Sequence, residues 1–139
     1  MNHDKAVIRY AGDALFIGIS PSGHALVMDT NHERASAATP VELLLISLGG
    51  CTAVDVVSIL AKKREKVTDY QVEVTGTRSD EHPRKFTRMG VRHILRGHNL
   101  SAKAVEQAIE LSEEKYCSVA ATLRPTVEIV SSYEIINEA

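Results

Sequence analysis

Residues 39–63 of the chain read TPVELLLISLGGCTAVDVVSILAKK, a long and mostly apolar segment. Thr39 is a favourable N-cap and Pro40 suits the first helical position, so the segment predicts a helix that begins there. Apolar residues on almost every side indicate a helix covered over most of its surface. Spacings of three and four place one narrow polar stripe on a single face: Ser47, Cys51, Asp55, Ser58 and Lys62.

The rest of the chain predicts strands on both sides of this helix, since runs rich in β-branched and aromatic residues alternate with turn residues. The predicted strands cover 5–10, 14–20, 25–28, 70–78, 86–95 and 126–136, with a charged connector over 64–69. Ser101 is expected to cap a second helix over 102–115, and a short third helix is expected over 116–123. This order predicts a single α+β domain spanning residues 1–139.

Composition narrows the class of partner. The 139 residues carry 16 Lys+Arg against 18 Asp+Glu, a net charge of −2, which argues against nucleic acid or an anionic membrane surface. The apolar run Val41 to Leu48 is too short for a membrane span, which needs about 18 residues. With no targeting segment visible in the first ten residues, the expected location is cytoplasmic, where thiols stay reduced.

The chain has two cysteines, Cys51 and Cys117, 66 positions apart and therefore not a C-x-x-C motif. In a reducing compartment such residues are either small buried hydrophobes or redox-active thiols. Cys51 lies in mid-helix and would need a cation, such as an arginine, to favour its thiolate. Cys117 lies near a predicted helix start and close to Lys115, and both features favour the thiolate. Two thiols with separate roles fit peroxide reduction, in which one becomes a sulfenic acid and the other resolves it.

Other kinds of site have no signature here. The six histidines, at positions 3, 24, 32, 82, 93 and 98, lack zinc-ligand spacing. Phosphate-binding glycine loops and a nucleophile elbow are also missing. We therefore expect no cofactor and no metal.

Four segments resemble a known family: Thr39-Pro40, the triplet ELL at 42–44, GGCTA at 49–53 and LSEEKYCSVA at 111–120. They are similar to the OsmC/Ohr family of thiol-dependent organic hydroperoxide reductases, and most similar to a bacterial subgroup without an assigned substrate. The resemblance implies curved antiparallel sheets wrapped around long central Cys-bearing helices in an intertwined homodimer. Close approach of another helix would also explain Gly49-Gly50 inside a helix, where each glycine costs roughly 1 kcal/mol.

The same resemblance implies the chemistry and the partners. Cys51 would attack a small organic hydroperoxide and Cys117 would resolve the product as a disulfide. A small dithiol or a lipoylated protein would then reduce that disulfide. These roles, the substrate class and the reductant come from the resemblance and not from the spacing of the residues.

The sequence departs from the family pattern at the two groups that normally assist the reactive cysteine. The family places a glutamate directly after the proline, whereas this chain has Val41 there and Glu42 one position later. At about 100° per residue, Glu42 lies half a turn from the Cys51 face. Glu42 is a candidate catalytic partner, and its alternative role is that of an acid at the helix N-terminus.

The assisting arginine is equally open. Arg34, in the polar loop before Thr39, is the main candidate, with Arg9 and Arg84 as alternatives and an ordinary surface charge as the structural interpretation. Asp55, one turn after Cys51, would raise the pKa of that thiol. Two other functions therefore stay open: a non-enzymatic redox sensor or binder of a small apolar ligand, and a structural dimer whose thiols are too far apart to bridge.

Overall fold

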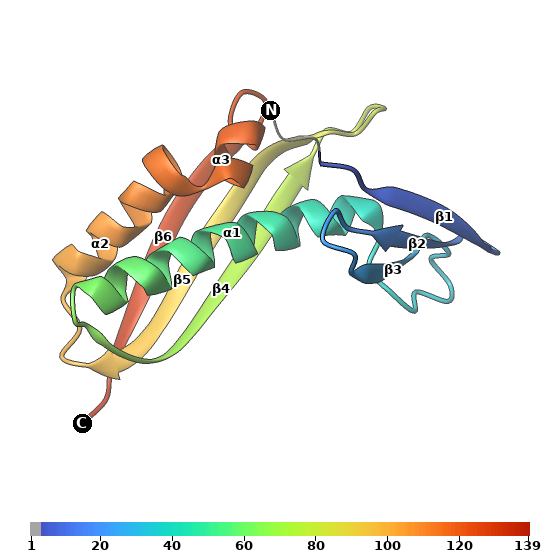
Figure 1. Cartoon of the computed structure of the whole chain (residues 1–139). Coiled ribbons are helices and arrows are strands. Elements are labelled where there is room, and N and C mark those ends of the chain that lie inside the picture. The colour runs from blue at the N-terminus through green and yellow to red at the C-terminus, as the bar shows by residue number, and fades with distance from the viewer. Residues whose placement is uncertain (1–3) are drawn as a thin grey trace. The chain divides into compact units, whose positions relative to one another are not determined.

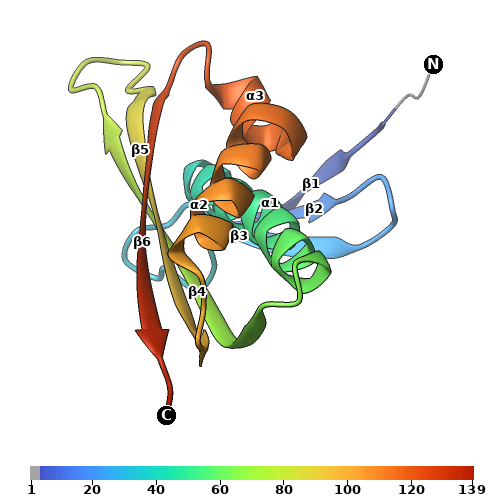
Figure 2. The same ribbon diagram turned by 90° about the vertical axis from the view of Figure 1, so that its left-hand side faces the viewer.

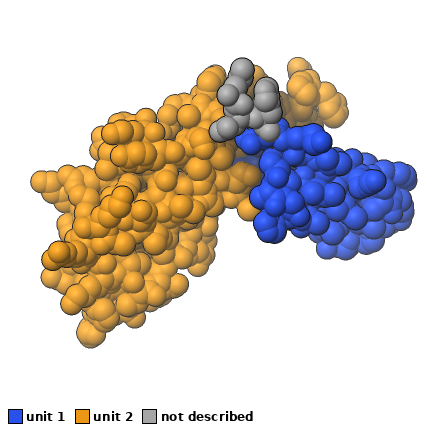
Figure 3. Space-filling view, in the orientation of Figure 1, with its two compact units in different colours: residues 1–44 blue, residues 45–139 orange. Residues whose placement is uncertain are grey.

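The computed structural model describes residues 4–139, which divide into two compact units at Leu44/Leu45 (Figure 3). The predicted α+β order of elements is confirmed along both units. The prediction of a single domain over 1–139 stays a prediction.

Unit 1 contains an antiparallel sheet of three strands in the order β1-β2-β3 (Figure 1). The strands are β1 (Val7–Gly12), β2 (Leu15–Ile19) and β3 (Ala25–Asp29), within two residues of the predicted bounds at each end. Gly12, with φ of 92°, starts the tight β1–β2 turn because glycine adopts this left-handed conformation without strain. The predicted turns therefore lie where the chain reverses.

Helix α1 (Pro40–Lys62) begins with a reciprocal pair of hydrogen bonds. The Thr39 N–H donates to Glu42 Oε1 at 2.8 Å, and the Glu42 N–H donates to Thr39 Oγ1 at 3.2 Å. This is a capping box, which satisfies two of the free amides at a helix start. The predicted helix and its N-cap are confirmed, and from Leu45 onward the helix is part of unit 2.

Unit 2 contains the second sheet, in the order β4-β5-β6. Strand β4 (Lys66–Arg78) pairs antiparallel with β5 (Phe86–His98), whereas β6 (Glu128–Asn137) runs parallel to β5 and so differs from the expected antiparallel pairing. The predicted connector over 64–69 is also wrong in part, because Lys66 already pairs with His98. Charged side chains are tolerated there because this end of β4 leaves them exposed to solvent.

Helices α1 and α2 (Ala102–Leu111) lie on the same face of the β4-β5-β6 sheet (Figure 2). A π-helical turn, η1 (Ser112–Tyr116), and the short helix α3 (Ser118–Leu123) follow α2. Ser101 caps α2 as predicted, since its side chain accepts the Ala104 N–H at 3.2 Å. The core between helices and sheet contains seven buried apolar side chains: Val56, Leu60, Leu95, Leu100, Val105, Ala108 and Ile109.

Gly49 has a reason to be glycine inside this unit. A Cβ at Gly49 would lie 2.9 Å from Val74 Cγ2 of β4, closer than real side chains approach. Within unit 2 the close neighbour of Gly49 is therefore a strand, and the close approach of another helix stays a prediction. A Cβ at Gly50 would meet nothing within 4 Å, so Gly50 faces open space.

Gly50 belongs to an exposed apolar face of α1. Ile46, Val54 and Val57 share that face and are 62%, 71% and 49% exposed. By length and composition alone α1 could cross a membrane, a test that core helices of soluble proteins also pass. Leu48, Val56 and Leu60 on its opposite side are buried, so the helix has one side in the core and one side uncovered.

Gly49→Ala should lower the free energy of unfolding by up to about 2 kcal/mol. Overpacking against Val74 costs about 1–3 kcal/mol, more than the roughly 1 kcal/mol that alanine gains in helix propensity. Urea unfolding followed by circular dichroism measures the change. In a Val74→Ala background the same substitution should be neutral or stabilising, because the Val74 methyl groups are gone. Equal losses in both backgrounds would contradict this packing argument.

Candidate functional site

The candidate site begins with a break in the chain at Cys117. The Cys117 N–H donates to the Ser112 carbonyl at 2.7 Å, an i→i+5 bond that closes η1. Cys117 itself is extended, with φ of −75° and ψ of 102°, and acts as the N-cap of α3. The predicted third helix therefore begins two residues late, at Ser118, and the chain turns so that the Val119 amide of α3 faces Cys51.

Cys51 is half-buried, and the start of α3 supplies its hydrogen-bond donors. Burial raises the pKa of the Cys51 thiol, but the Val119 N–H, the Cys117 thiol and the Ser118 hydroxyl lower it, and the net direction is downward. Hydrogen bonds donated to the charged form have this effect because they stabilise the thiolate. Neutral groups thus favour the Cys51 thiolate inside unit 2, where the sequence had suggested a cation.

Cys117 has the opposite character. Burial, the largest cause, and the neighbouring Cys51 together raise the pKa of its thiol to about 11, against the Ala120 N–H, which lowers it. The Ala120 N–H donates to Cys117 Sγ at 3.3 Å, and the side chain is only 2% exposed. The expectation that its helix start and Lys115 favour a Cys117 thiolate is therefore wrong, because burial outweighs both. The pair therefore holds one sulfur whose thiolate is favoured and one sulfur whose thiol is favoured.

The two thiols are neighbours in the fold, since each one shifts the pKa of the other. This geometry disagrees with the structural-dimer alternative, in which the two cysteines would be too far apart to bridge. It brings together Cys51 and Cys117, two of the four predicted site residues, from α1 and from the junction of η1 and α3. Local sequence contained no signal for this meeting, because it depends on how α2 packs beside α1.

Asp55 is the one charged group that acts on Cys51 within unit 2, and it raises the pKa of the thiol, as the sequence predicted. Its carboxylate accepts a hydrogen bond from the Ser112 hydroxyl at 2.9 Å. Beyond Asp55 a groove of about 380 Å³ runs along the polar stripe of α1, lined by Asp55, Ser58, Ile59, Lys62, Lys63, Leu111 and Tyr116. The sequence did not predict that Ser112 bonds Asp55, although Ser112 lies in segment 111–120, which matches the family pattern.

Arg34 is fully engaged inside unit 1. Its Nε and Nη2 donate to the two carboxylate oxygens of Asp29 at 2.8 and 2.9 Å, and its Nη1 donates to Asp13 Oδ2 at 2.7 Å. Asp29 is 1% exposed, and its hydrogen bonds with Arg34 and Ser36 hold the pKa of its carboxyl far below the usual range. Arg34 thus has a structural role in this loop, and its catalytic role stays a prediction.

Glu42 likewise has a structural role, because its carboxylate accepts the Thr39 N–H in the capping box. This is the alternative that the sequence left open, and a catalytic role for Glu42 stays a prediction. Arg9 is exposed on β1, and Arg84 lies in the loop between β4 and β5. The groups of unit 2 that act on the Cys51 thiolate do not include Arg84.

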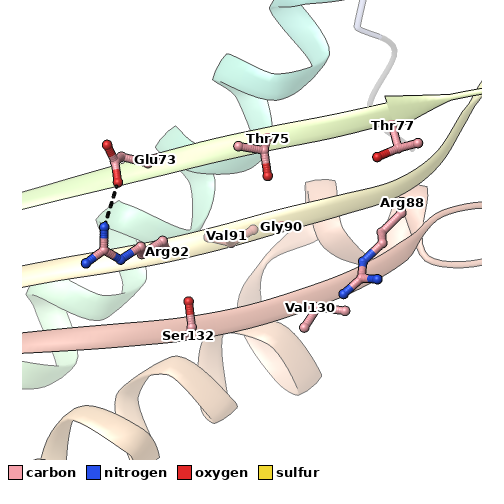
Figure 4. Close-up of a pocket in the computed structure, with 9 residues that line it drawn as sticks. All are labelled: Glu73, Thr75, Thr77, Arg88, Gly90, Val91, Arg92, Val130 and Ser132. Atoms are coloured by element: carbon pink, nitrogen blue, oxygen red, sulfur yellow. Dashed lines mark hydrogen bonds and ion pairs between the residues drawn. The ribbon is translucent and has the colours of Figure 1, made fainter.

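Other parts of the described chain contain less chemistry. Residues 4–139 hold no group of three or more metal-binding side chains, and His3 lies outside the described residues. His93 is fully buried and its Nδ1 lies 2.6 Å from the Tyr70 hydroxyl, a core pair in which burial lowers the pKa of His93 to about 4. A larger hollow of about 580 Å³ lies on the open face of the β4-β5-β6 sheet (Figure 4), where Arg92 pairs with Glu73 and no thiol is present.

Comparison with known proteins connects this site to a family. The family model for OsmC-like proteins matches residues 32–132, which include both cysteines. The chain belongs to the OsmC-like family. It is 43% identical to protein YhfA of Escherichia coli strain K12 over 132 residues, covering 95% of this chain and 98% of YhfA. The resemblance found in the sequence is confirmed.

Solved structures support the same assignment. A hypothetical protein from Aquifex aeolicus VF5 is 32% identical with a TM-score of 0.88, and all of both chains is covered. The organic hydroperoxide resistance protein OhrB of Bacillus subtilis is 13% identical with a TM-score of 0.65, over 96% of this chain and 98% of that one. At that identity the match to OhrB shows the fold alone.

Ser118→Ala should make Cys51 less reactive toward iodoacetamide. Removing a donor to the thiolate raises the pKa of Cys51, so the midpoint of its alkylation rate moves to higher pH. Below that midpoint the rate should fall about fivefold, the effect of losing a hydrogen bond of about 1 kcal/mol. Site-resolved mass spectrometry across pH 5–10 measures it. Thr77→Ala, exposed on β4, is the control, and an unchanged profile in Ser118→Ala would contradict the assigned donor.

Proposed function

We propose that this OsmC-like protein reduces organic hydroperoxides through Cys51 and Cys117, as a thiol peroxidase in oxidative stress defence. The observation that carries the proposal is the contact between a sulfur whose thiolate is favoured and a second sulfur that is held protonated. A peroxidatic cysteine needs a favoured thiolate with some access to solvent, and Cys51 combines a lowered pKa with partial exposure. A resolving cysteine needs proximity and a protonated resting state, and Cys117 has both.

In the first step the Cys51 thiolate attacks the outer oxygen of the hydroperoxide. An S–O bond forms while the O–O bond breaks, so Cys51 becomes a sulfenic acid and the alkoxide takes a proton from solvent to leave as an alcohol. The exposed Ser118 hydroxyl beside Cys51 offers a path for that proton. No metal or cofactor is needed for this step.

In the second step Cys117 attacks the sulfenic sulfur of Cys51. A disulfide forms, and the hydroxyl group leaves as water with the Cys117 proton. A small dithiol or a lipoylated protein then reduces the disulfide by thiol exchange and becomes oxidised itself. This cycle requires a reducing compartment, in agreement with the cytoplasmic location that we propose.

We also propose that the protein acts as a homodimer through the exposed face of α1. Ile46, Gly50, Val54 and Val57 form an apolar surface with room for another backbone at Gly50. Surfaces of this kind mark interaction sites, and a second copy offers the same surface in return. The intertwined arrangement remains an expectation from the family.

Peroxidase activity is tested by mixing the protein with cumene hydroperoxide and dihydrolipoamide and following peroxide loss. The wild type should consume many equivalents, because each disulfide is reduced and reused. Cys51→Ser should show only the background rate, and Cys117→Ser should accumulate a sulfenic acid detectable by dimedone. If the protein forms a single equivalent of disulfide without turnover, it acts as a redox sensor and not as an enzyme. Thiols inert to peroxide would leave only a binder of a small apolar ligand.

Val54→Asp should break the proposed dimer. Two-fold symmetry would bury two unpaired carboxylates, and each costs about 2–5 kcal/mol, enough to raise the dissociation constant at least about 100-fold. Light scattering after size exclusion gives the mass. Thr75→Asp on the open face of the β4-β5-β6 sheet adds the same charge and should leave the mass unchanged. A Val54→Asp protein with the wild-type mass at micromolar concentration would exclude this face as the interface.

A further inference from the structure

A buried chain of hydrogen bonds joins α1 to the turn that carries Cys117. Ser112 is fully buried and Thr52 is 3% exposed. The Ser112 hydroxyl donates to Asp55 Oδ2 at 2.9 Å, and Thr52 Oγ1 lies 2.9 Å from Ser112 Oγ. A hydroxyl has one hydrogen, and that of Ser112 is given to Asp55. The Thr52 hydroxyl must therefore donate to Ser112, and the chain runs from Thr52 through Ser112 to the Asp55 carboxylate.

Ser112 has a second connection, through its backbone. Its carbonyl accepts the Cys117 N–H at 2.7 Å and closes the π-helical turn. A π-helical turn holds one residue more than an α-helical turn and is frequent at functional sites. The same residue thus binds α1 with its side chain and fixes the backbone of Cys117 with its carbonyl.

The two ends of this link lie on either side of the reacting sulfurs. Thr52 follows Cys51 directly and Asp55 is one turn further along α1, while Cys117 leads into the start of α3, whose Val119 amide and Ser118 hydroxyl act on Cys51. We propose that Ser112 and Asp55 are positioning residues, which hold η1 against α1 so that Cys117 and the start of α3 stay in contact with Cys51. The inference rests on the proposed thiol chemistry but not on peroxide turnover.

The Asp55 carboxylate disfavours the Cys51 thiolate, and this effect distinguishes a positioning role from a role in activating Cys51. Among the titratable groups that act on the Cys51 thiol, Cys117 favours the thiolate, whereas Asp55 opposes it. A residue present only to activate Cys51 would not be an anion. The role of Asp55 is explained if it accepts the hydrogen bond of the buried Ser112 hydroxyl. Its carboxylate holds Ser112 in place, although it also lowers the fraction of Cys51 present as thiolate.

Two substitutions at the same hydrogen bond should therefore shift Cys51 in opposite directions. Asp55→Asn keeps an oxygen that accepts from Ser112 but removes the charge, so alkylation of Cys51 by iodoacetamide at pH 6 should become roughly threefold faster. Ser112→Ala cuts the link, so Cys51 loses donors and its alkylation should become roughly threefold to tenfold slower. Site-resolved mass spectrometry across pH 5–10 separates the two profiles. A role in stability alone would not produce opposite shifts.

The second readout is disulfide formation with diamide, which oxidises two neighbouring thiols without any peroxide. Asp55→Asn should form the Cys51–Cys117 disulfide at the wild-type rate or faster, while Ser112→Ala and Asp55→Ala should be about tenfold slower. Asp55→Ala removes the same hydrogen bond to Ser112, but at a side chain that is only partly buried. This variant therefore tests the proposal even if Ser112→Ala does not fold. Ser58→Ala, exposed on the same stripe of α1, is the control and should match the wild type.

Wild-type diamide rates in Asp55→Ala, or shifts of the same sign in Asp55→Asn and Ser112→Ala, would overturn the positioning role. Failure of the proposed peroxidase would look different. The variants would still differ in alkylation and in diamide oxidation, while even the wild type would not turn over cumene hydroperoxide.

Discussion

The arrangement of the two sulfurs depends on one backbone hydrogen bond, from the Cys117 N–H to the Ser112 carbonyl. That bond closes the π-helical turn η1, which follows α2. The chain then leaves the helical conformation at Cys117, whose backbone is extended. An uninterrupted helix would direct its amides along its own axis and keep them bonded within the helix. Because the chain restarts as α3, two groups at its start, the Val119 amide and the Ser118 hydroxyl, are free to face Cys51.

Two cysteines of one chain become chemically different because the fold surrounds them differently. Cys51 is half-buried on α1 and receives hydrogen bonds, and Cys117 is nearly inaccessible and donates its thiol hydrogen. The contact itself widens the difference, since a thiolate on one sulfur favours a thiol on the other. Proximity and unequal protonation are what a two-cysteine cycle requires, and both follow from the packing of η1 and α3 beside α1.

Features with strong local signals could be predicted from the sequence. Thr39-Pro40 marks the start of α1, and Ser101 marks the start of α2. The parallel pairing of β6 with β5 was not predicted, although the helices between the two strands form the crossover that parallel neighbours need. The π-helical turn was missed as well, since residues 112–116 favour helix without indicating an extra residue per turn. Cys117 was misjudged for the related reason that burial is a property of the fold and not of the neighbouring residues.

The absence of a glutamate directly after Pro40 raised the question of what favours the Cys51 thiolate. Within unit 2 the donors are neutral, and Asp55 and burial act against them. This balance has a chemical advantage, because the nucleophilicity of a thiolate falls as its pKa falls, and attack is fastest when that pKa lies near the ambient pH. A strong cationic partner would raise the fraction of thiolate but weaken each thiolate as a nucleophile. Neutral donors opposed by one carboxylate lower the pKa of Cys51 without a cationic partner, which suits a sulfur that in the proposed cycle must both ionise and attack.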